Sequence, residues 1–293
     1  MSRIRLRANA KLNLTLDVVG RREDGYHCLR SVMQSVSLAD QVTLTKQVSG
    51  IALQVDSSQV PTNEDNLAWK AAAIFRERTG IKGGVLIEIE KRIPVSAGLA
   101  GGTTDAAAVL IGLNILYGKN LPLSKLQKIG LKIGADLPFC LQGGTVLVEG
   151  IGERLTALPP FPDVTLVVAG LKEKVSTTWV YRGLTSDAYG TAFSSNFIRA
   201  FKAGKSAEEI SGVLGNTLES VTAAFVPGIE LWKRRLLDGG AHGALMSGSG
   251  PAVFGLFTEE ERAREFRKRW ELEEKIFLVK PVKAGILEMN GGA

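Results

Sequence analysis

The chain contains few of the residues that hold structural metal ions. Of its 293 residues, two are cysteine and two are histidine. Cys28 and Cys140 do not form a Cys-x-x-Cys pair, the usual half-site of a structural zinc ion. This composition argues against a zinc-stabilised fold and predicts an enzyme with reduced thiols.

Long apolar runs are also missing. The N-terminal stretch MSRIRLRANAKLNLTLDVVG alternates charged and apolar residues and lacks the apolar core of a signal peptide. No other run is long enough to span a bilayer. We therefore expect a cytoplasmic protein without a membrane partner.

Positive charge is not concentrated in one stretch. The net charge of +6 suits a partner that carries phosphate groups. The densest charged segment, EEERAREFRKRWELEEK at 259–275, mixes both signs at helical spacing, as a solvated helix face does. Because no basic arm with interleaved aromatic residues is present, we expect a small-molecule substrate and no nucleic-acid partner.

The apolar residues are sufficient for two cores. They make up 45% of a chain that is longer than most single domains. The proline-rich segment ALPPFPD at 157–163 is the best candidate for a domain boundary. We therefore predict an N-terminal domain of residues 1–158 and a C-terminal domain of residues 159–293.

Hydrophobic periodicity predicts both strands and helices. Alternating apolar residues indicate strands within 3–19, 31–46 and 83–93. Helical spacing indicates helices at 66–78, from a cap at Thr103 or Thr104 to Gly118, and at 124–133, 207–214, 217–224 and 228–237. Because the two kinds of element mix without a strict βαβ repeat, the predicted fold class is α+β.

The stretch PVSAGLAGGTTD at 94–105 lies between a predicted strand and a predicted helix. A glycine-rich turn in this position lets backbone N–H groups and the helix dipole face an anion. It is not a Walker loop, because Thr103 follows Gly102 where lysine is required, and it lacks the G-x-G-x-x-G spacing. It predicts a phosphate site whose positive charge comes from a metal ion, the helix dipole or a distant lysine.

Two motifs resemble those of one enzyme family. Residues 94–104 resemble the glycine-rich motif of the GHMP small-molecule kinases, and LMSGSGPAVFG at 245–255 resembles their C-terminal motif. The similarity covers most of the chain and is weakest near 185–215. It implies a two-domain GHMP kinase fold with the active site in the cleft between domains, and ATP with Mg²⁺ as phosphate donor.

Three further segments resemble one subgroup of this family, whose acceptor is a cytidine diphosphate sugar alcohol. They are residues 8–36, 133–155 and 174–181. This resemblance implies transfer of the γ-phosphate of ATP to the 2-hydroxyl of that acceptor, in the non-mevalonate route to isoprenoid precursors.

The resemblance also implies which groups react. It places Lys11 in the active site as the distant positive charge, and Asp136 as the base that accepts the proton of the acceptor hydroxyl. Asn13 shares a strand face with Lys11 and is expected to bind the reacting alcohol. From the residues alone, Lys11 could also be a surface lysine on an edge strand, and Asp136 an acceptor of backbone N–H groups at a turn.

The remaining site residues follow from the same resemblance. The expected ATP-binding residues are Asn66, which also suits a helix N-cap, and Pro94, Val95, Ser96, Ala97, Gly98, Leu99, Ala100, Gly101, Gly102, Thr103 and Thr104. The C-terminal glycine motif contributes Gly248, Ser249 and Gly250. Thr104 is the candidate contact for Mg²⁺.

The acceptor is expected to lie against a second group of residues. These are Tyr26, His27, Thr177, Thr178 and Tyr181. The chain departs from the family pattern at Trp179, which leaves open whether Trp179 or Tyr181 stacks on the base. The choice between the two threonines for the acceptor diphosphate is also open.

Two alternatives compete with this interpretation. Another GHMP kinase would phosphorylate mevalonate or homoserine, but such an acceptor has no nucleobase and would not require the Tyr26–His27 pair. A non-catalytic nucleotide-binding module would keep the glycine loop without needing Lys11 or Asp136. We expect the protein to be a monomer or a weak homodimer.

Overall fold

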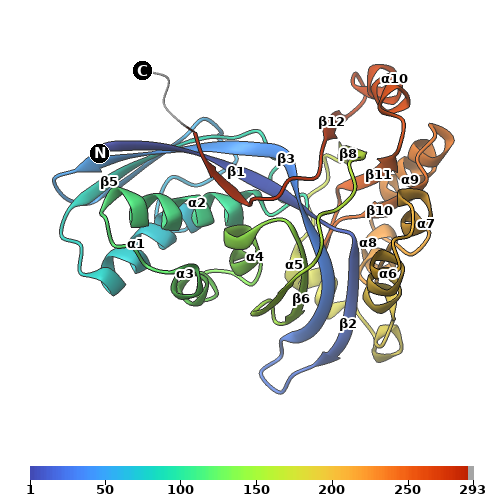
Figure 1. The fold of residues 1–293 in the computed structure, drawn as a ribbon, viewed down its shortest axis with the longest axis horizontal. Helices are drawn as coiled ribbons and strands as arrows, with labels where there is room; N and C mark the ends of the chain where they lie inside the picture. The colour runs from blue at the N-terminus through green and yellow to red at the C-terminus, as the bar shows by residue number, and fades with distance from the viewer. Residues whose placement is uncertain (290–293) are drawn as a thin grey trace.

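The computed structural model describes residues 1–289 as two sheets, each packed against helices (Figure 1). Helices α1–α4 lie in the left part of the view with most of the larger sheet, whose strands β2 and β3 extend downward near the middle, and the smaller sheet with helices α6–α10 lies on the right. This mixture confirms the predicted α+β class. Within residues 1–289, no helix combines the length and apolar character needed to cross a bilayer.

The larger sheet is organised around one long strand, β3 (His27–Gln47), whose 21 residues pair antiparallel with four neighbours. Those neighbours are β1 (Arg3–Asn13), β2 (Thr15–Arg21), β5 (Gly84–Glu90) and β6 (Thr145–Gly150). The sheet is completed by β4 (Ile51–Val55), β7 (Arg154–Ala157), β9 (Gly215–Asn216) and β13 (Ile286–Glu288). The three predicted strand segments are therefore confirmed.

Four helices belong to this sheet and lie on one side of it in Figure 1. They are α1 (Leu67–Thr79), α2 (Gly101–Leu116), α3 (Leu123–Gly130) and α4 (Leu137–Gln142). Helix α2 is apolar on nearly every side and packs against β1 and β3, with Ala106–Leu110 fully buried. The sequence predicted the other three helices but not α4, whose six residues are too few for a helical period.

The smaller sheet is antiparallel in the order β10-β11-β8-β12. Its strands are β8 (Thr165–Gly170), β10 (Gly243–Met246), β11 (Val253–Phe257) and β12 (Lys275–Val279). The helices of this half are α5 (Thr177–Arg182), α6 (Phe193–Lys202), α7 (Ala207–Ser211), α8 (Glu219–Ala223), α9 (Gly228–Asp238) and α10 (Glu260–Trp270), with a 3-10 turn at Ser186–Ala188.

The two halves share a hydrophobic core. Ala10 and Leu12 of β1 pack in the same buried cluster as Leu166 of β8 and Phe254 of β11. Beyond residue 158, β9 and β13 return to pair with β2 and β1 of the larger sheet. The boundary at residue 158 stays a prediction, and the halves on either side of it are joined by common strands and a common core.

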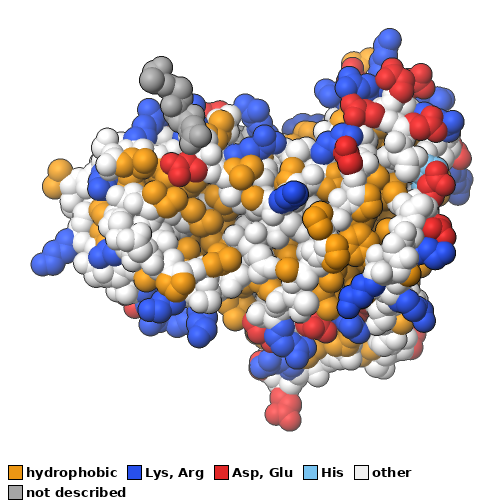
Figure 2. All heavy atoms as spheres, viewed as in Figure 1, with side chains coloured by type: hydrophobic (Ala, Val, Ile, Leu, Met, Phe, Trp, Pro, Cys, Tyr) orange, Lys and Arg blue, Asp and Glu red, His pale blue; other side chains and the backbone are white. Residues whose placement is uncertain are grey.

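The charged segment near the C-terminus forms the surface of α10, as predicted. Ion pairs along this segment join Arg262 to Glu259, Arg264 to Glu260 and Arg267 to Glu271. Figure 2 shows acidic and basic side chains interspersed at the upper right, where α10 lies in Figure 1. Such exposed pairs keep a helix solvated and contribute little stability each.

Candidate active site

A cavity of about 1200 Å³ is lined by residues from both halves of the chain. Its volume exceeds the range of about 300–1,000 Å³ that is usual for one small ligand. The predicted site residues that line it are Lys11, Asn13, Tyr26, His27, Asn66, Pro94, Val95, Ser96, Ala97, Gly98, Ala100, Gly101, Gly102, Thr103, Asp136, Thr177, Thr178, Tyr181, Gly248, Ser249 and Gly250. The cavity is large enough for two substrates side by side.

The glycine loop ends in the N-terminus of α2. This helix begins at Gly101, after Ala100 in a left-handed conformation with φ 60°. The expected cap at Thr103 or Thr104 is therefore wrong, because both residues already lie inside the helix. Since alanine has no side-chain oxygen with which to cap α2, the first N–H groups of the helix remain available to an anion.

Two predicted residues of the loop face away from the cavity. Thr104 is fully buried and donates its hydroxyl to the carbonyl oxygen of Asn9 at 2.9 Å. Leu99 is buried in the shared core, and its carbonyl oxygen accepts the N–H of Lys11. Neither Thr104 nor Leu99 lines the cavity, so the Mg²⁺ contact of Thr104 and the ATP contact of Leu99 stay predictions that this arrangement does not support. Thr103 carries the hydroxyl on the cavity side.

The turn that contains Gly248 and Gly250, the second glycine turn, lies directly against the glycine loop of residues 94–105. Ser247 donates its hydroxyl to the carbonyl oxygen of Gly98 at 3.1 Å, and Ala252 donates its N–H to that of Ala97 at 3.2 Å. A Cβ atom at Gly98, whose φ is 77°, would overlap the carbonyl oxygen of Ser247. Glycine is therefore required at Gly98 by both its conformation and its neighbour.

Lys11 and Asp136 meet in the cavity between these turns. Lys11 and Asn13 project from the face of β1 opposite the core residues Ala10 and Leu12, as strand alternation requires. The Lys11 ammonium is 2.5 Å from Asn13 Oδ1 and 3.6 Å from the Asp136 carboxylate. The Lys11 side chain is 4% exposed and that of Asp136 33% exposed, so the carboxylate remains accessible to a ligand.

Local structure explains the orientation of Asn13 and Asp136. The side-chain nitrogen of Asn13, Nδ2, donates a hydrogen bond to Ser31 Oγ at 2.8 Å. This bond leaves Asn13 Oδ1 directed at Lys11. Asp136 precedes α4 but its side chain makes no capping hydrogen bond. The carboxylate is therefore not occupied as a turn acceptor, which was the structural alternative for this residue.

An aromatic platform lies at another part of the cavity. The His27 ring stacks on Tyr181, with centroids 5.2 Å apart, and its Nε2 is 3.1 Å from the Tyr189 hydroxyl. Burial and the nearby Arg21 lower the pKa of His27, so the ring is neutral near pH 7. Tyr26 is 64% exposed at the rim of the cavity.

The two aromatic candidates differ in their position relative to the cavity. Trp179 packs edge-on against the exposed Phe225, with centroids 4.3 Å apart, and is not among the cavity residues. Tyr181, two residues further along α5, lines the cavity beside His27. Tyr189 was missed by the sequence analysis, because it lies in the stretch with the weakest family similarity.

The two threonines of α5 both line the cavity. Thr177 Oγ1 is 2.9 Å from Ser249 Oγ, which links α5 to the second glycine turn. Thr178 follows it on the same helix. Both threonines remain candidates for contact with an acceptor diphosphate.

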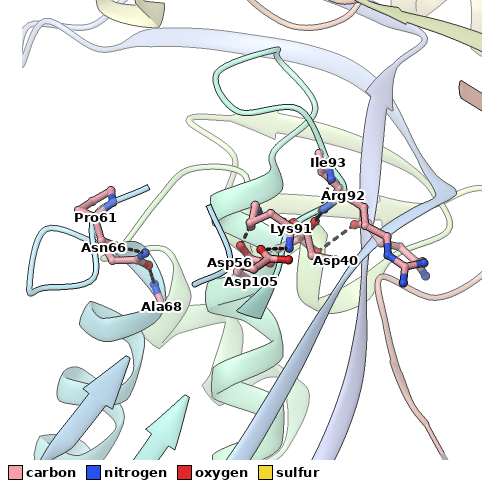
Figure 3. A network of polar contacts seen from close by, with 11 residues as sticks. Asp40, Asp56, Pro61, Asn66, Ala68, Lys91, Arg92, Ile93 and Asp105 are labelled. Carbon is pink, nitrogen blue, oxygen red and sulfur yellow. Dashed lines mark hydrogen bonds and ion pairs between the residues drawn. The ribbon is translucent and has the colours of Figure 1, made fainter. Parts of the chain in front are cut away.

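The sequence analysis missed a group of charged residues near Asn66, which Figure 3 shows. Lys91 forms ion pairs with Asp40 and Asp105, and both Lys91 and Asp105 line the cavity. The available signal was the position of Lys91, three residues before the glycine motif. Near them, Asn66 caps α1 by accepting the N–H of Ala68 at 2.8 Å, as predicted, and it also faces the cavity.

Comparison with known proteins gives one consistent family. Residues 66–144 match the GHMP kinases N terminal domain, and residues 197–274 match the GHMP kinases C terminal family. Proteins named 4-diphosphocytidyl-2-C-methyl-D-erythritol kinase from Acetivibrio thermocellus and Clostridium botulinum are 45% and 44% identical to the chain. The alignments cover 90% and 94% of this chain, and 93% and 99% of the two relatives.

Solved structures agree with this grouping. A crystal structure of 4-(cytidine 5'-diphospho)-2C-methyl-D-erythritol kinase is 35% identical, with a TM-score of 0.81 over 94% of this chain and 98% of the other. A homoserine kinase from Cytophaga hutchinsonii has a TM-score of 0.79 at 21% identity, over 99% and 98% of the two chains. The latter likeness concerns the fold alone.

The geometry of the glycine loop predicts the effect of a side chain at Gly102. A Cβ atom there would have only Leu67 within 4 Å, at 3.8 Å, so Gly102→Val leaves the fold intact while filling space at the cavity wall. We expect affinity for an ATP analogue to fall at least tenfold, measured by calorimetry, with an unchanged melting temperature. Gly102 lies in α2 and has no positive φ, so the expected effect of valine comes from the space that it fills.

A matched variant separates loop shape from ligand access. Gly98→Ala forces a side chain against Ser247 and into a left-handed conformation, so it should lower the melting temperature as well as nucleotide affinity. Unchanged nucleotide affinity in Gly102→Val would place the phosphates elsewhere in the cavity.

Proposed function

The chain belongs to the GHMP kinase family, and we propose that it transfers the γ-phosphate of ATP to the 2-hydroxyl of 4-diphosphocytidyl-2-C-methyl-D-erythritol. This reaction belongs to the non-mevalonate route to isoprenoid precursors. The observation that carries the proposal is one cavity in which the Lys11–Asp136 pair lies with two glycine turns and a His27–Tyr181 platform. The relatives at about 45% identity support the same acceptor.

The donor end is formed by backbone groups. The triphosphate would lie against the first N–H groups of α2 and the turn at Gly98, with the adenosine toward Asn66. Within residues 1–289, no cluster of three or more His, Cys, Asp or Glu side chains could hold a metal ion. A site without such a cluster fits an ion carried by the triphosphate itself, with the Thr103 hydroxyl as a protein contact, and Mg²⁺ there would neutralise phosphate charge.

The acceptor end supplies the proton chemistry. The acceptor hydroxyl oxygen forms a bond to the γ-phosphorus, the bond from that phosphorus to the β–γ bridging oxygen breaks, and ADP leaves. Asp136 takes the hydroxyl proton, and Lys11 stabilises negative charge that develops on the reacting oxygens. Asn13 orients the alcohol and holds the Lys11 ammonium, so the pair is fixed before the substrates bind.

The remote cytidine orients the acceptor. Gripping a part of the substrate that does not react can hold the hydroxyl in line with the γ-phosphate. A neutral His27 imidazole offers one donor and one acceptor to a base edge, and Tyr181 offers a stacking face. This platform is also the feature that favours a cytidine acceptor over mevalonate or homoserine.

A panel of acceptors tests the proposed substrate. We expect ADP formation with 4-diphosphocytidyl-2-C-methyl-D-erythritol and less than one hundredth of that rate with mevalonate, homoserine or galactose. The measurement is a coupled assay for ADP with each acceptor at equal concentration. Faster turnover of any of the other three would overturn the assignment of the substrate but keep the kinase.

Removing the charge of Asp136 should stop the chemical step. Asp136→Asn preserves shape but cannot take the proton, so kcat should fall by about 10²–10⁴-fold, the usual effect of losing a general base. Affinity for an ATP analogue should stay within twofold of wild type. The control is Asp163→Asn at an exposed aspartate, which should leave kcat unchanged. If Asp136→Asn kept more than a tenth of the wild-type kcat, Asp136 would not be the base.

Replacing His27 should remove base recognition without affecting ATP. Contacts to one stacked base contribute about 1–3 kcal/mol, so His27→Ala should lower kcat/KM for the cytidine acceptor by about 5- to 150-fold. The preference over a uridine analogue should disappear. The matched control is His242→Ala, because His242 lies near Thr258 in the other half of the chain. A His27→Ala enzyme that kept the wild-type preference would show that another group reads the base.

A further inference from the structure

A buried cluster of three charged side chains lies under the glycine loop. Lys91 contacts a carboxylate oxygen of Asp40 and lies 2.7 Å from Asp105 Oδ2 (Figure 3). The three side chains are 7%, 0% and 4% exposed. Asp40 belongs to β3, Lys91 follows β5, and Asp105 belongs to α2, so the cluster joins three elements.

The cluster connects the two ends of the loop. Lys91 stands at the entry to the loop and Asp105 just beyond its exit, so their ion pair joins both ends. Asp40 also accepts the backbone N–H groups of Arg92 and Ile93, at 2.6 and 2.8 Å. The entry segment is therefore held by three contacts to one carboxylate.

The loop between these ends is conformationally strained. Ser96 and Ala100 have φ values of 57° and 60°, a left-handed region that side chains with a Cβ atom rarely adopt. Such residues persist only where the surrounding structure determines their conformation. A rigid connection between the ends of the loop would meet that requirement.

Stability alone is a poor explanation for the cluster. Replacing a buried ion-pair cluster with apolar side chains is often neutral or stabilising, because burying charge is costly. Burial raises the pKa of Asp105 and the neighbouring Asp40 adds to this, while the ammonium of Lys91 lowers it and favours the charged carboxylate. Burial alone would lower the pKa of Lys91, but the two carboxylates outweigh it and raise it. Within the part of the chain that the structure describes, Asp105 Oδ1 has no hydrogen-bond partner.

We propose that Lys91, Asp40 and Asp105 are positioning residues that hold the glycine loop in the shape that binds the triphosphate of ATP. This inference rests on the proposed kinase function and deepens it. The cluster lies beside the donor end of the cavity, so it acts on ATP binding and not on the acceptor. The reacting pair Lys11 and Asp136 lies outside it.

The test compares variants of Asp105. Asp105→Ala removes the partner of Lys91 and should raise KM for ATP at least tenfold, while kcat at saturating ATP and KM for the acceptor stay within threefold. Asp105→Asn keeps an oxygen for Lys91 and should recover most of the ATP affinity. If Asp105→Ala does not fold, Lys91→Arg provides a second measurement, because it keeps the charge but changes the shape of the side chain. We expect KM for ATP to rise in Lys91→Arg as well, by a smaller factor than in Asp105→Ala.

A second readout separates positioning from direct contact with ATP. Without nucleotide, amide hydrogen exchange of residues 92–103 should be faster in Asp105→Ala than in wild type. The matched control is Asp17→Ala, because Asp17 is a buried carboxylate that accepts the N–H groups of Phe193 and Ser194. Asp17→Ala should lower the melting temperature without changing KM for ATP.

The outcomes distinguish this inference from the function on which it rests. Binding of a non-hydrolysable ATP analogue is measured by calorimetry without acceptor. If wild type did not bind the analogue, both the kinase proposal and this inference would be overturned. If wild type and Asp105→Ala bound it equally, or if loop exchange were unchanged, this inference alone would be overturned.

Discussion

The contact between the two glycine turns is the constraint on which the rest of the site depends. Ser247 and Ala252 from the second half of the chain hydrogen-bond to Gly98 and Ala97 of the first. Because these bonds involve backbone carbonyl groups, they fix the path of both turns and not merely a pair of side chains. The shared core beneath them holds the two walls of the cavity at one separation.

This arrangement explains how a phosphate loop can function without a lysine of its own. Lys11 arrives from β1, and its ammonium lies near Gly248 of the second turn as well as Asp136. Lys91 arrives from beneath the loop, but two buried carboxylates already surround it. The roles proposed for the two lysines therefore differ: Lys11 for charge that develops during the reaction, and Lys91 for the shape of the loop.

The comparison with other family members separates fold from specificity. A homoserine kinase shares the fold at 21% identity, and a fold does not by itself select an acceptor. The platform of His27, Tyr181 and Tyr189 is formed where the β2–β3 hairpin approaches the segment around α5. Specificity for a base can thus change through these elements while the donor site is preserved.

The sequence by itself determined the α+β class, the strands β1, β2, β3 and β5 of the larger sheet, the glycine loop and the residues carried by family motifs. These features depend on local periodicity or short motifs, which can be read without knowing the neighbours. Lys11 and Asp136 could be named in this way, and the structure brings them within 3.6 Å.

Only the tertiary structure decided which side chains face the cavity. Thr104 and Thr103 are adjacent in sequence, but the early start of α2 turns Thr104 toward Asn9 and Thr103 toward the cavity. The partners of Lys91 lie 51 and 14 residues away, at distances no local pattern can report. Orientation and long-range pairing depend on how the elements pack, and for that reason they could not be predicted from the order of the residues.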